Sequence, residues 1–257
     1  MVFNFFFSPL EQFEVLPLVP FYFGGMDFSI TNETIILILI FFIIHTFYFF
    51  CTNNKDFTLG LIPSKVQVIF EGIYKVIFGL VVDNLGQKVG QKFFPVIFSV
   101  FFLIVCLNLI GLVPYSFTLT SHLIVTFVFA LFIFIAFNII CVRTHGLAFF
   151  SLFLPSGTSF ALALLLVPIE VISYVFKPVS LSIRLFANMM AGHTLLKVIA
   201  GFAWTLGACS GILFFVHYIP LLILLPLFGL ELGVALIQSF VFVILLCIYL
   251  NDAINLH

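Results

Sequence analysis

Long apolar runs separated by short polar breaks dominate the chain, and their lengths predict membrane-spanning helices. The run from Ile35 to Phe50 follows residues 31–33, whose polar side chains are typical of a helix start. Residues 93–142 carry no formal charge, and a break at 114–122 separates two runs near the roughly 20 residues that a bilayer core requires. The pattern predicts a single membrane domain (1–257) made of an outer tail (1–33), a transmembrane helix (34–50), an interfacial helix (63–85), a transmembrane hairpin (93–142) and a long tilted hairpin (158–250).

The predicted interfacial helix has one apolar face and one polar face. Polar Gln67, Glu71 and Lys75 are spaced by four, and Glu71 precedes Lys75 in the order that favours pairing within a helix. An amphipathic helix of this kind is typical of the membrane interface. The apolar residues recur at helical spacing, and they are Val66, Ile69, Phe70, Ile73, Val76, Ile77, Leu80 and Val81.

The C-terminal hairpin is unusually long. Its first helix, predicted from about residue 158 to 204, has a length of about 70 Å at roughly 1.5 Å per residue, far more than a bilayer core. This helix must be tilted, bent or broken, and Pro168 and Pro178 are the expected bend points. A turn of small residues at 205–215 then leads into the last helix.

Composition supports an integral membrane protein and excludes several other classes. The chain is 64% hydrophobic and 7% charged, with a mean hydropathy of +1.36. Charge-free runs of helix-spanning length predict an all-α polytopic fold with five crossings and one interfacial helix, rather than a barrel. No basic cluster suits nucleic acid, and five scattered cysteines without a CxxC pair favour buried thiols over a metal or redox site.

The distribution of basic residues predicts the orientation. With the acidic N-terminal tail outside, five crossings place the C-terminus inside, together with every loop that carries Lys or Arg. The remaining basic residues, Lys177, Arg184 and Lys197, all lie on the first helix of the long hairpin.

Polar residues in the long hairpin form the candidate site. A charge at the depth of Arg184 is costly in lipid and is a functional hypothesis by default. If the hairpin turns near residue 211, residues whose numbers sum to about 422 lie opposite one another. This register predicts three polar layers: Arg184 with Gln238, His193 with Glu231, and Glu170 with Asp252. For Asn108 and Asn138, outside this hairpin, we expect interhelical hydrogen bonds, with a water-lined path as the alternative.

Helical phase supports part of this arrangement. Glu170, Lys177 and Arg184 are spaced by seven, about two turns, and so share a face. Ser180 and Asn188 lie four residues on either side of Arg184. His193 falls about half a turn away from Arg184, so either it faces a different cavity wall or the helix is distorted.

Titratable groups on both sides of a fixed positive charge suggest a proton path with a barrier at Arg184. His and a buried Glu can exchange protons, whereas a guanidinium stays protonated. A carboxylate on a partner subunit must then carry the proton past the arginine. Two other readings stay open: a secondary transporter that binds an anionic substrate at Arg184, which lacks the expected inverted repeat, and a structural scaffold in which Arg184 and Glu231 are expendable.

The segment from Lys177 to His193, KPVSLSIRLFANMMAGH, resembles subunit a of the F-type ATP synthase. Glu170, upstream, and the pair Glu231 and Gln238, seven apart, support the resemblance. Weaker similarity covers residues 8–14 and 108–122. Many bacterial members have an acid at the position of His193 and a His at that of Glu231, and this chain has the order of the mitochondrial branch.

The resemblance implies a role for each site residue. Arg184 would face the ring of c subunits, favour deprotonation of each arriving carboxylate and block leakage between two half-channels. Glu231, His193, Asn188 and Gln238 would line the inlet, and Glu170 would lie toward the exit. Ser180, Lys177 and Asp252 are supporting residues.

The resemblance also implies partners and a location. The expected partners are the c-ring, the peripheral stalk, other membrane-sector subunits, lipid and a second ATP synthase in a dimer. The chain would perform no covalent chemistry of its own and would need no cofactor or metal. The expected location is the mitochondrial inner membrane, with the N-terminus in the intermembrane space and the C-terminus in the matrix. A bacterial plasma membrane is the alternative.

Overall fold

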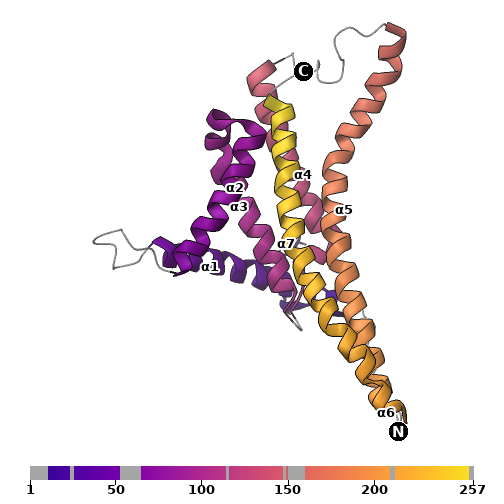
Figure 1. Ribbon diagram of the computed structural model, residues 1–257. Coiled ribbons are helices and arrows are strands. Elements are labelled where there is room, and N and C mark those ends of the chain that lie inside the picture. The colour runs from indigo at the N-terminus through magenta and orange to yellow at the C-terminus, as the bar shows by residue number, and fades with distance from the viewer. Residues whose placement is uncertain are drawn as a thin grey trace, which may run out of the picture. The chain divides into compact units, whose positions relative to one another are not determined.

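The computed structural model describes residues 11–23, 26–52, 65–113, 116–146, 149, 160–208 and 212–254. These residues are predominantly helical (Figure 1). The helices are α1 (Asn32–Thr52), α2 (Lys65–Leu85), α3 (Gln87–Gly111), α4 (Leu123–His145), α5 (Phe160–Gly207), α6 (Ile212–Val216) and α7 (Tyr218–Ile254). Among the described residues, five stretches are long and apolar enough to cross a membrane: 32–49, 87–111, 123–145, 164–207 and 214–254, the last of which runs from α6 into α7. The predicted all-α polytopic fold with five crossings is therefore confirmed.

Helix α3 begins at Gln87, six residues before the charge-free run starts. Lys88 and Lys92 end the apolar pattern, but their side chains favour helix, so the backbone stays helical through them. Gly86, with φ 76°, separates α3 from α2 and donates its N–H to Val82 O at 2.8 Å. A glycine in the left-handed region commonly ends a helix in this way.

Short strands occur in the N-terminal segment, which the sequence predicted only as a tail. β1 (Pro17–Val19) pairs antiparallel with β4 (Ile30–Thr31), and β2 (Tyr22–Phe23) pairs with β3 (Met26–Asp27). The strands are too short for a core of their own. Their backbone pairing connects the residues before Pro17 to the start of α1.

Helix α5 is continuous through both internal prolines. Its 48 residues correspond to about 72 Å at 1.5 Å per residue, longer than a bilayer core. Helix α7 continues four residues past the predicted end, to Ile254. The membrane tilt of this hairpin and the interfacial position of α2 stay predictions.

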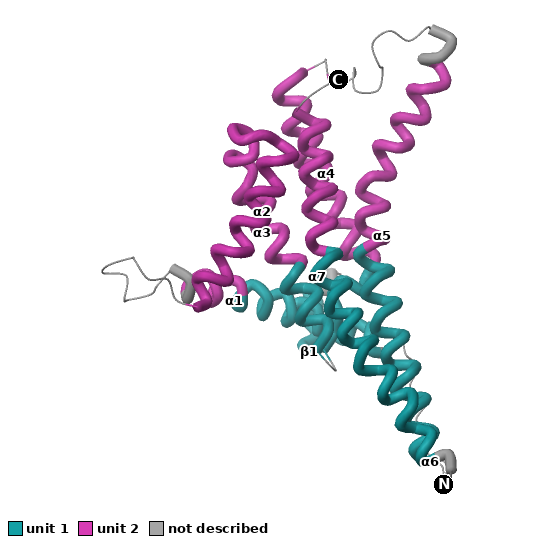
Figure 2. The backbone as a smooth tube through the Cα atoms, viewed as in Figure 1, with its two compact units in different colours: residues 1–43, 105–122, 185–238 teal, residues 44–104, 123–184, 239–257 magenta. Residues whose placement is uncertain are grey.

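The chain divides into two compact units, which are described separately (Figure 2). Unit 1 comprises residues 1–43, 105–122 and 185–238, and unit 2 comprises 44–104, 123–184 and 239–257. In unit 1, Leu112 of α3, Met189 of α5 and Ala235 of α7 form a buried cluster. Three helices therefore meet at this level, within one turn of the polar residues described below.

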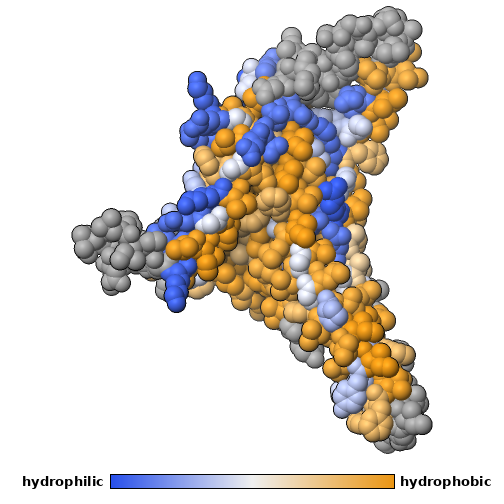
Figure 3. Space-filling model, in the orientation of Figure 1, coloured by the Kyte–Doolittle hydropathy of each residue, from blue (hydrophilic) through white to orange (hydrophobic). Residues whose placement is uncertain are grey.

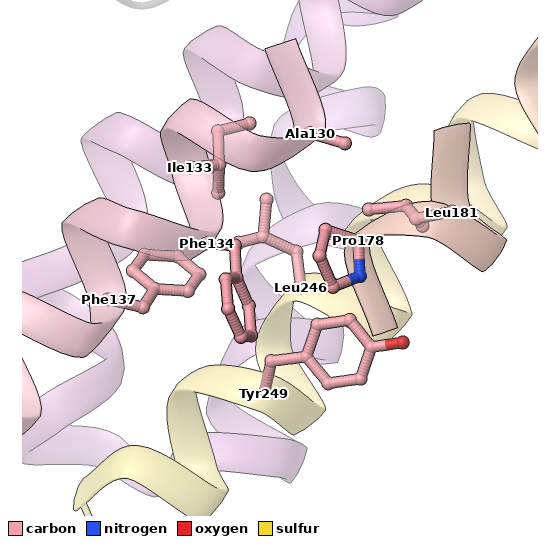
Figure 4. A pocket seen from close by; sticks show the side chains of 8 residues that line it. All are labelled: Ala130, Ile133, Phe134, Phe137, Pro178, Leu181, Leu246 and Tyr249. Atoms are coloured by element: carbon pink, nitrogen blue, oxygen red, sulfur yellow. The ribbon is translucent and has the colours of Figure 1, made fainter. Parts of the chain in front are cut away.

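Unit 2 has a core of aromatic and aliphatic side chains. The rings of Tyr74 on α2 and Phe94 on α3 are 4.7 Å apart between centroids, in an edge-to-face arrangement that aromatic pairs favour. A small apolar recess in this unit is lined by Ala130 of α4, Leu181 of α5 and Leu246 of α7, among others (Figure 4). The described residues that line the recess are apolar except for the hydroxyl group of Tyr249.

Large apolar side chains also cover much of the surface (Figure 3). Leu222, Leu225 and Leu230 on α7 are 74%, 77% and 62% exposed. Exposure on this scale costs free energy in water, and it suits a helix whose outer face meets lipid or another subunit.

Candidate functional site

A buried His–Glu pair joins α5 to α7 in unit 1. His193 Nε2 lies 3.8 Å from Glu231 Oε1, and the Glu231 side chain is 6% exposed. The hairpin register predicted this pair. Neither carboxylate oxygen of Glu231 has a hydrogen-bond partner within 3.5 Å among the described residues. A buried carboxyl of this kind retains full capacity to exchange a proton with a neighbour.

Gly192, next to His193, makes room for the carboxyl group. A Cβ atom at position 192 would lie 2.5 Å from Glu231 Oε1 and 2.9 Å from its Cδ. These distances are shorter than a normal van der Waals contact. The glycine therefore allows α7 to bring Glu231 directly against α5.

A second polar contact follows along the same two helices. Asn188 Nδ2 donates to Gln238 Oε1 at 2.8 Å, and Gln238 is 5% exposed. The amide nitrogen of Gln238 is buried without a partner among the described residues. Since Gln238 lies seven residues after Glu231, both side chains project from one face of α7. The structure thus brings four of the predicted site residues into two adjacent polar contacts.

Asn108 adds a third helix to this level of unit 1. It is fully buried, and its Nδ2 donates to the backbone oxygen of Ala235 at 3.2 Å. Ala235 lies between Glu231 and Gln238 on α7. The expected interhelical hydrogen bond of Asn108 is confirmed, but the sequence did not connect this residue to the site, because nothing local indicates that α3 ends beside α7.

Asn138 makes the corresponding contact in unit 2. Its Oδ1 accepts a hydrogen bond from the hydroxyl group of Tyr174 on α5. Its Nδ2 donates to Phe134 O within α4 at 2.9 Å. The expected interhelical bond is confirmed here as well.

The predicted pairing of Glu170 with Asp252 is wrong. In unit 2 the Asp252 carboxylate instead accepts from Lys177 Nζ at 2.9 Å. The Lys177 ammonium also lies 5.2 Å from the ring centroid of Tyr174 and 5.0 Å from that of Tyr249, within the range of cation–π attraction. Glu170 is exposed, two turns before Lys177 on α5. A long lysine side chain reaches the carboxylate, and two like charges avoid each other.

Arg184 is partly buried on α5, and Ser180, one turn earlier, is exposed. Within the described residues of unit 2, Arg184 forms no salt bridge. Its predicted proximity to Gln238 stays a prediction, because the two residues belong to different units.

A second His–Glu pair lies at the start of α1 in unit 1. His122 Nε2 lies 3.8 Å from Glu33 Oε1, and both side chains are about a quarter exposed. The turn before His122 contains buried Thr118, Thr120 and Ser121, and Thr118 Oγ1 donates to Ser121 Oγ at 2.7 Å. The sequence did not identify this pair, because its members are far apart along the chain and only the fold brings them together.

Comparisons with known proteins place the chain in a family. A sequence model of the family described as ATP synthase A chain matches residues 34–251, a range that includes the His193–Glu231 and Asn188–Gln238 contacts. The chain is similar to the ATP synthase subunit a of Pylaiella littoralis, at 56% identity over 252 residues, 97% of this chain and 99% of that protein. It is 50% identical to that of Chondrus crispus over 250 residues, 97% of both chains. It is 47% identical to that of Marchantia polymorpha over 252 residues, 97% of this chain and 99% of that protein.

Proposed function

The chain belongs to the family of ATP synthase A chains, and we propose that it is the proton-conducting stator subunit of the F-type membrane sector. It forms two half-channels and passes protons to and from carboxylates of the rotor c-ring, which drives rotation and ATP synthesis. The observation that carries the proposal is the buried His193–Glu231 pair. Burying two titratable groups 3.8 Å apart inside an apolar bundle is costly, and a proton-handling role explains why the chain has them there.

The inlet half-channel follows the polar face of unit 1. His193 and Glu231 exchange protons, and the amide groups of Asn188 and Gln238 continue the hydrogen-bonding groups along α5 and α7. Buried atoms without an internal partner, Gln238 Nε2 and Asn108 Oδ1, supply one donor and one acceptor at the same level. A proton path requires such groups, because an apolar wall offers no relay.

Arg184 performs the separate task of meeting the c-ring. Its guanidinium favours the ionised form of an arriving c-ring carboxylate and repels a proton that leaks between the half-channels. Arg184 forms no salt bridge with the residues of unit 2 that the structure describes, and this supports the role. Glu170, exposed on α5, belongs to the exit path, while Ser180 and the Lys177–Asp252 pair support α5 and α7 near that path.

The remaining expectations complete the proposal. The N-terminus lies in the intermembrane space and the C-terminus in the matrix of a mitochondrial inner membrane, since basic loops favour the inner side. The peripheral stalk, other membrane-sector subunits and lipid cover the exposed apolar helices. A dimer of ATP synthases contains two copies of this chain.

An arginine replacement tests the proposal directly. Arg184→Ala in the complete complex should abolish ATP-driven proton pumping into vesicles, because the ring carboxylate loses its fixed partner charge. Arg143→Ala, at the exposed end of α4, is the matched control and should pump normally. Normal coupled pumping by assembled Arg184→Ala would refute the stator role.

A further inference from the structure

One aromatic side chain of the N-terminal segment is buried while its neighbours are not. Phe13, at the end of a short 3-10 turn (Glu11–Phe13), is 9% exposed. Val15 and Leu16, which follow, are 43% and 56% exposed. General apolar burial of the segment does not explain this difference, so particular neighbours in unit 1 must bury the side chain of Phe13.

One of the neighbours of Phe13 is His193. The two ring centroids are 6.4 Å apart and the ring planes are at 84°, an edge-to-face arrangement. The benzyl ring neither donates nor accepts a conventional hydrogen bond and cannot carry a proton. A ring at this distance leaves the imidazole less room to rotate, and the Nε2 atom of the same imidazole lies 3.8 Å from Glu231 Oε1.

Asn32 fastens the segment that carries Phe13 to the start of α1. Its Nδ2 donates to Glu14 O at 3.1 Å, and its Oδ1 accepts from the N–H of Leu16 at 3.2 Å. The same Oδ1 accepts from Glu33 N at 3.1 Å within the first turn of α1. The pairing of β1 with β4 adds to this attachment. The position of Phe13 is therefore determined by hydrogen bonds beginning one residue after it.

Gln12, the polar residue before Phe13, supports a location of this turn beside a hydrated route. The amide nitrogen of Gln12 is buried and has no hydrogen-bond partner among the described residues. Such a group is costly in an apolar packing role. The turn thus combines an apolar cover with an unsatisfied donor immediately beside it.

We propose that Phe13 is a positioning residue of the proton inlet: its ring covers the open side of His193, holds the imidazole toward Glu231, and limits access of outer water to the pair. This inference rests on the proposed function of His193 and Glu231. Residues 12–16, attached to Asn32, then form part of the wall of the half-channel and do more than lead into α1.

The chemical accessibility of His193 tests this assignment independently of proton flux. Diethyl pyrocarbonate reacts with accessible imidazole groups, and mass spectrometry of the complete complex measures the reaction rate at each histidine. Phe13→Ala should raise the rate at His193 severalfold, because the cover is removed. Phe13→Leu, which keeps an apolar cover, should restore a rate close to that of the unaltered chain.

Phe117 provides a matched control. Its ring stacks on His122 in the same unit, with centroids 5.0 Å apart and planes at 22°. Phe117→Ala should raise the reaction rate at His122 and leave that at His193 unchanged. The assignment would be overturned if the reaction rate at His193 were unchanged in Phe13→Ala. It would also be overturned if Phe117→Ala raised the rate at His193 as much as Phe13→Ala does.

A second variant covers the case in which Phe13→Ala does not assemble. Asn32→Ala removes the attachment but keeps the ring, and should also raise the rate at His193. An unchanged rate in that variant overturns the assignment. Proton flux in Glu231→Gln tests the proposed function separately. Normal flux there, with a raised His193 rate in Phe13→Ala, would refute the channel while leaving the cover in place.

Discussion

The carboxyl group of Glu231 on α7 fills the space that a side chain at Gly192 on α5 would occupy. The closest approach to a Cβ at position 192 would be 2.5 Å, to Oε1. Since His193 contacts the same oxygen at 3.8 Å, two consecutive residues of α5 determine where Glu231 lies. The missing side chain at Gly192 and the imidazole of His193 therefore act together on the carboxyl group of Glu231.

Gly192→Ala should therefore displace Glu231 and reduce proton flux. Overpacking of a tight contact typically costs about 1–3 kcal/mol. Because this cost applies only to the arrangement in which Glu231 lies against His193, the population of that arrangement, and with it the proton flux through the assembled complex, should fall about tenfold. Gly201→Ala is the control on the same helix, because a Cβ there meets nothing within 4 Å. Equal fluxes in the two variants would contradict a positioning role for Gly192.

Glu231→Gln should slow proton entry without releasing the subunit from the complex. The amide group has nearly the same shape but cannot give up a proton, and loss of a positioned acid–base group typically costs about 10²-fold or more. Passive proton flux in vesicles, with assembly checked by native electrophoresis, measures the effect. Glu71→Gln on α2, whose carboxylate accepts from Gln67, should leave the flux unchanged. Flux that matches the unaltered complex across pH would remove Glu231 from the path.

Asn188 and Gln238 should act as a unit. Asn188→Ala leaves Gln238 buried with a further unpaired atom, its Oε1. Adding Gln238→Ala to that variant should therefore reduce proton flux less than Gln238→Ala does alone. We expect a coupling energy of about 1 kcal/mol from a double-mutant cycle on proton flux. Thr205→Ala, which removes a hydroxyl group that donates to Phe202 O within α5, should be additive with Gln238→Ala. Additivity for both pairs would mean that the 2.8 Å hydrogen bond does not contribute to conduction.

The Lys177–Asp252 pair should affect stability more than conduction. Asp252→Asn removes the charge partner of a lysine that is 26% exposed, and ion pairs of this exposure contribute up to about 1 kcal/mol. A small decrease in the thermal dissociation temperature of the complex is expected, with a flux close to normal. Lys177→Met combined with Asp252→Asn should recover part of the loss. A flux as low as that of Glu231→Gln would instead place Asp252 in the proton path.

The spans and the main polar contact could be predicted from sequence because their causes are local. Bilayer thickness determines the length of an apolar run, and a short turn between antiparallel helices determines which residues are near one another. The same register failed at Asp252. Pairing residues whose numbers have a constant sum assumes that both helices keep the same phase and the same rise per residue over many turns. In the structure, the long side chain of Lys177 reaches the carboxylate of Asp252 instead.

The sequence by itself determined the membrane class, five spans, the His193–Glu231 register and the resemblance to a family, since these depend on hydropathy, helix period and a continuous motif. Only the tertiary structure decided that Asn108 contacts Ala235, that the ring of Phe13 lies edge-to-face with His193 and that His122 faces Glu33. In each of these contacts, residues distant in sequence meet through packing or strand pairing. Neither helical period nor apolar run length encodes such meetings.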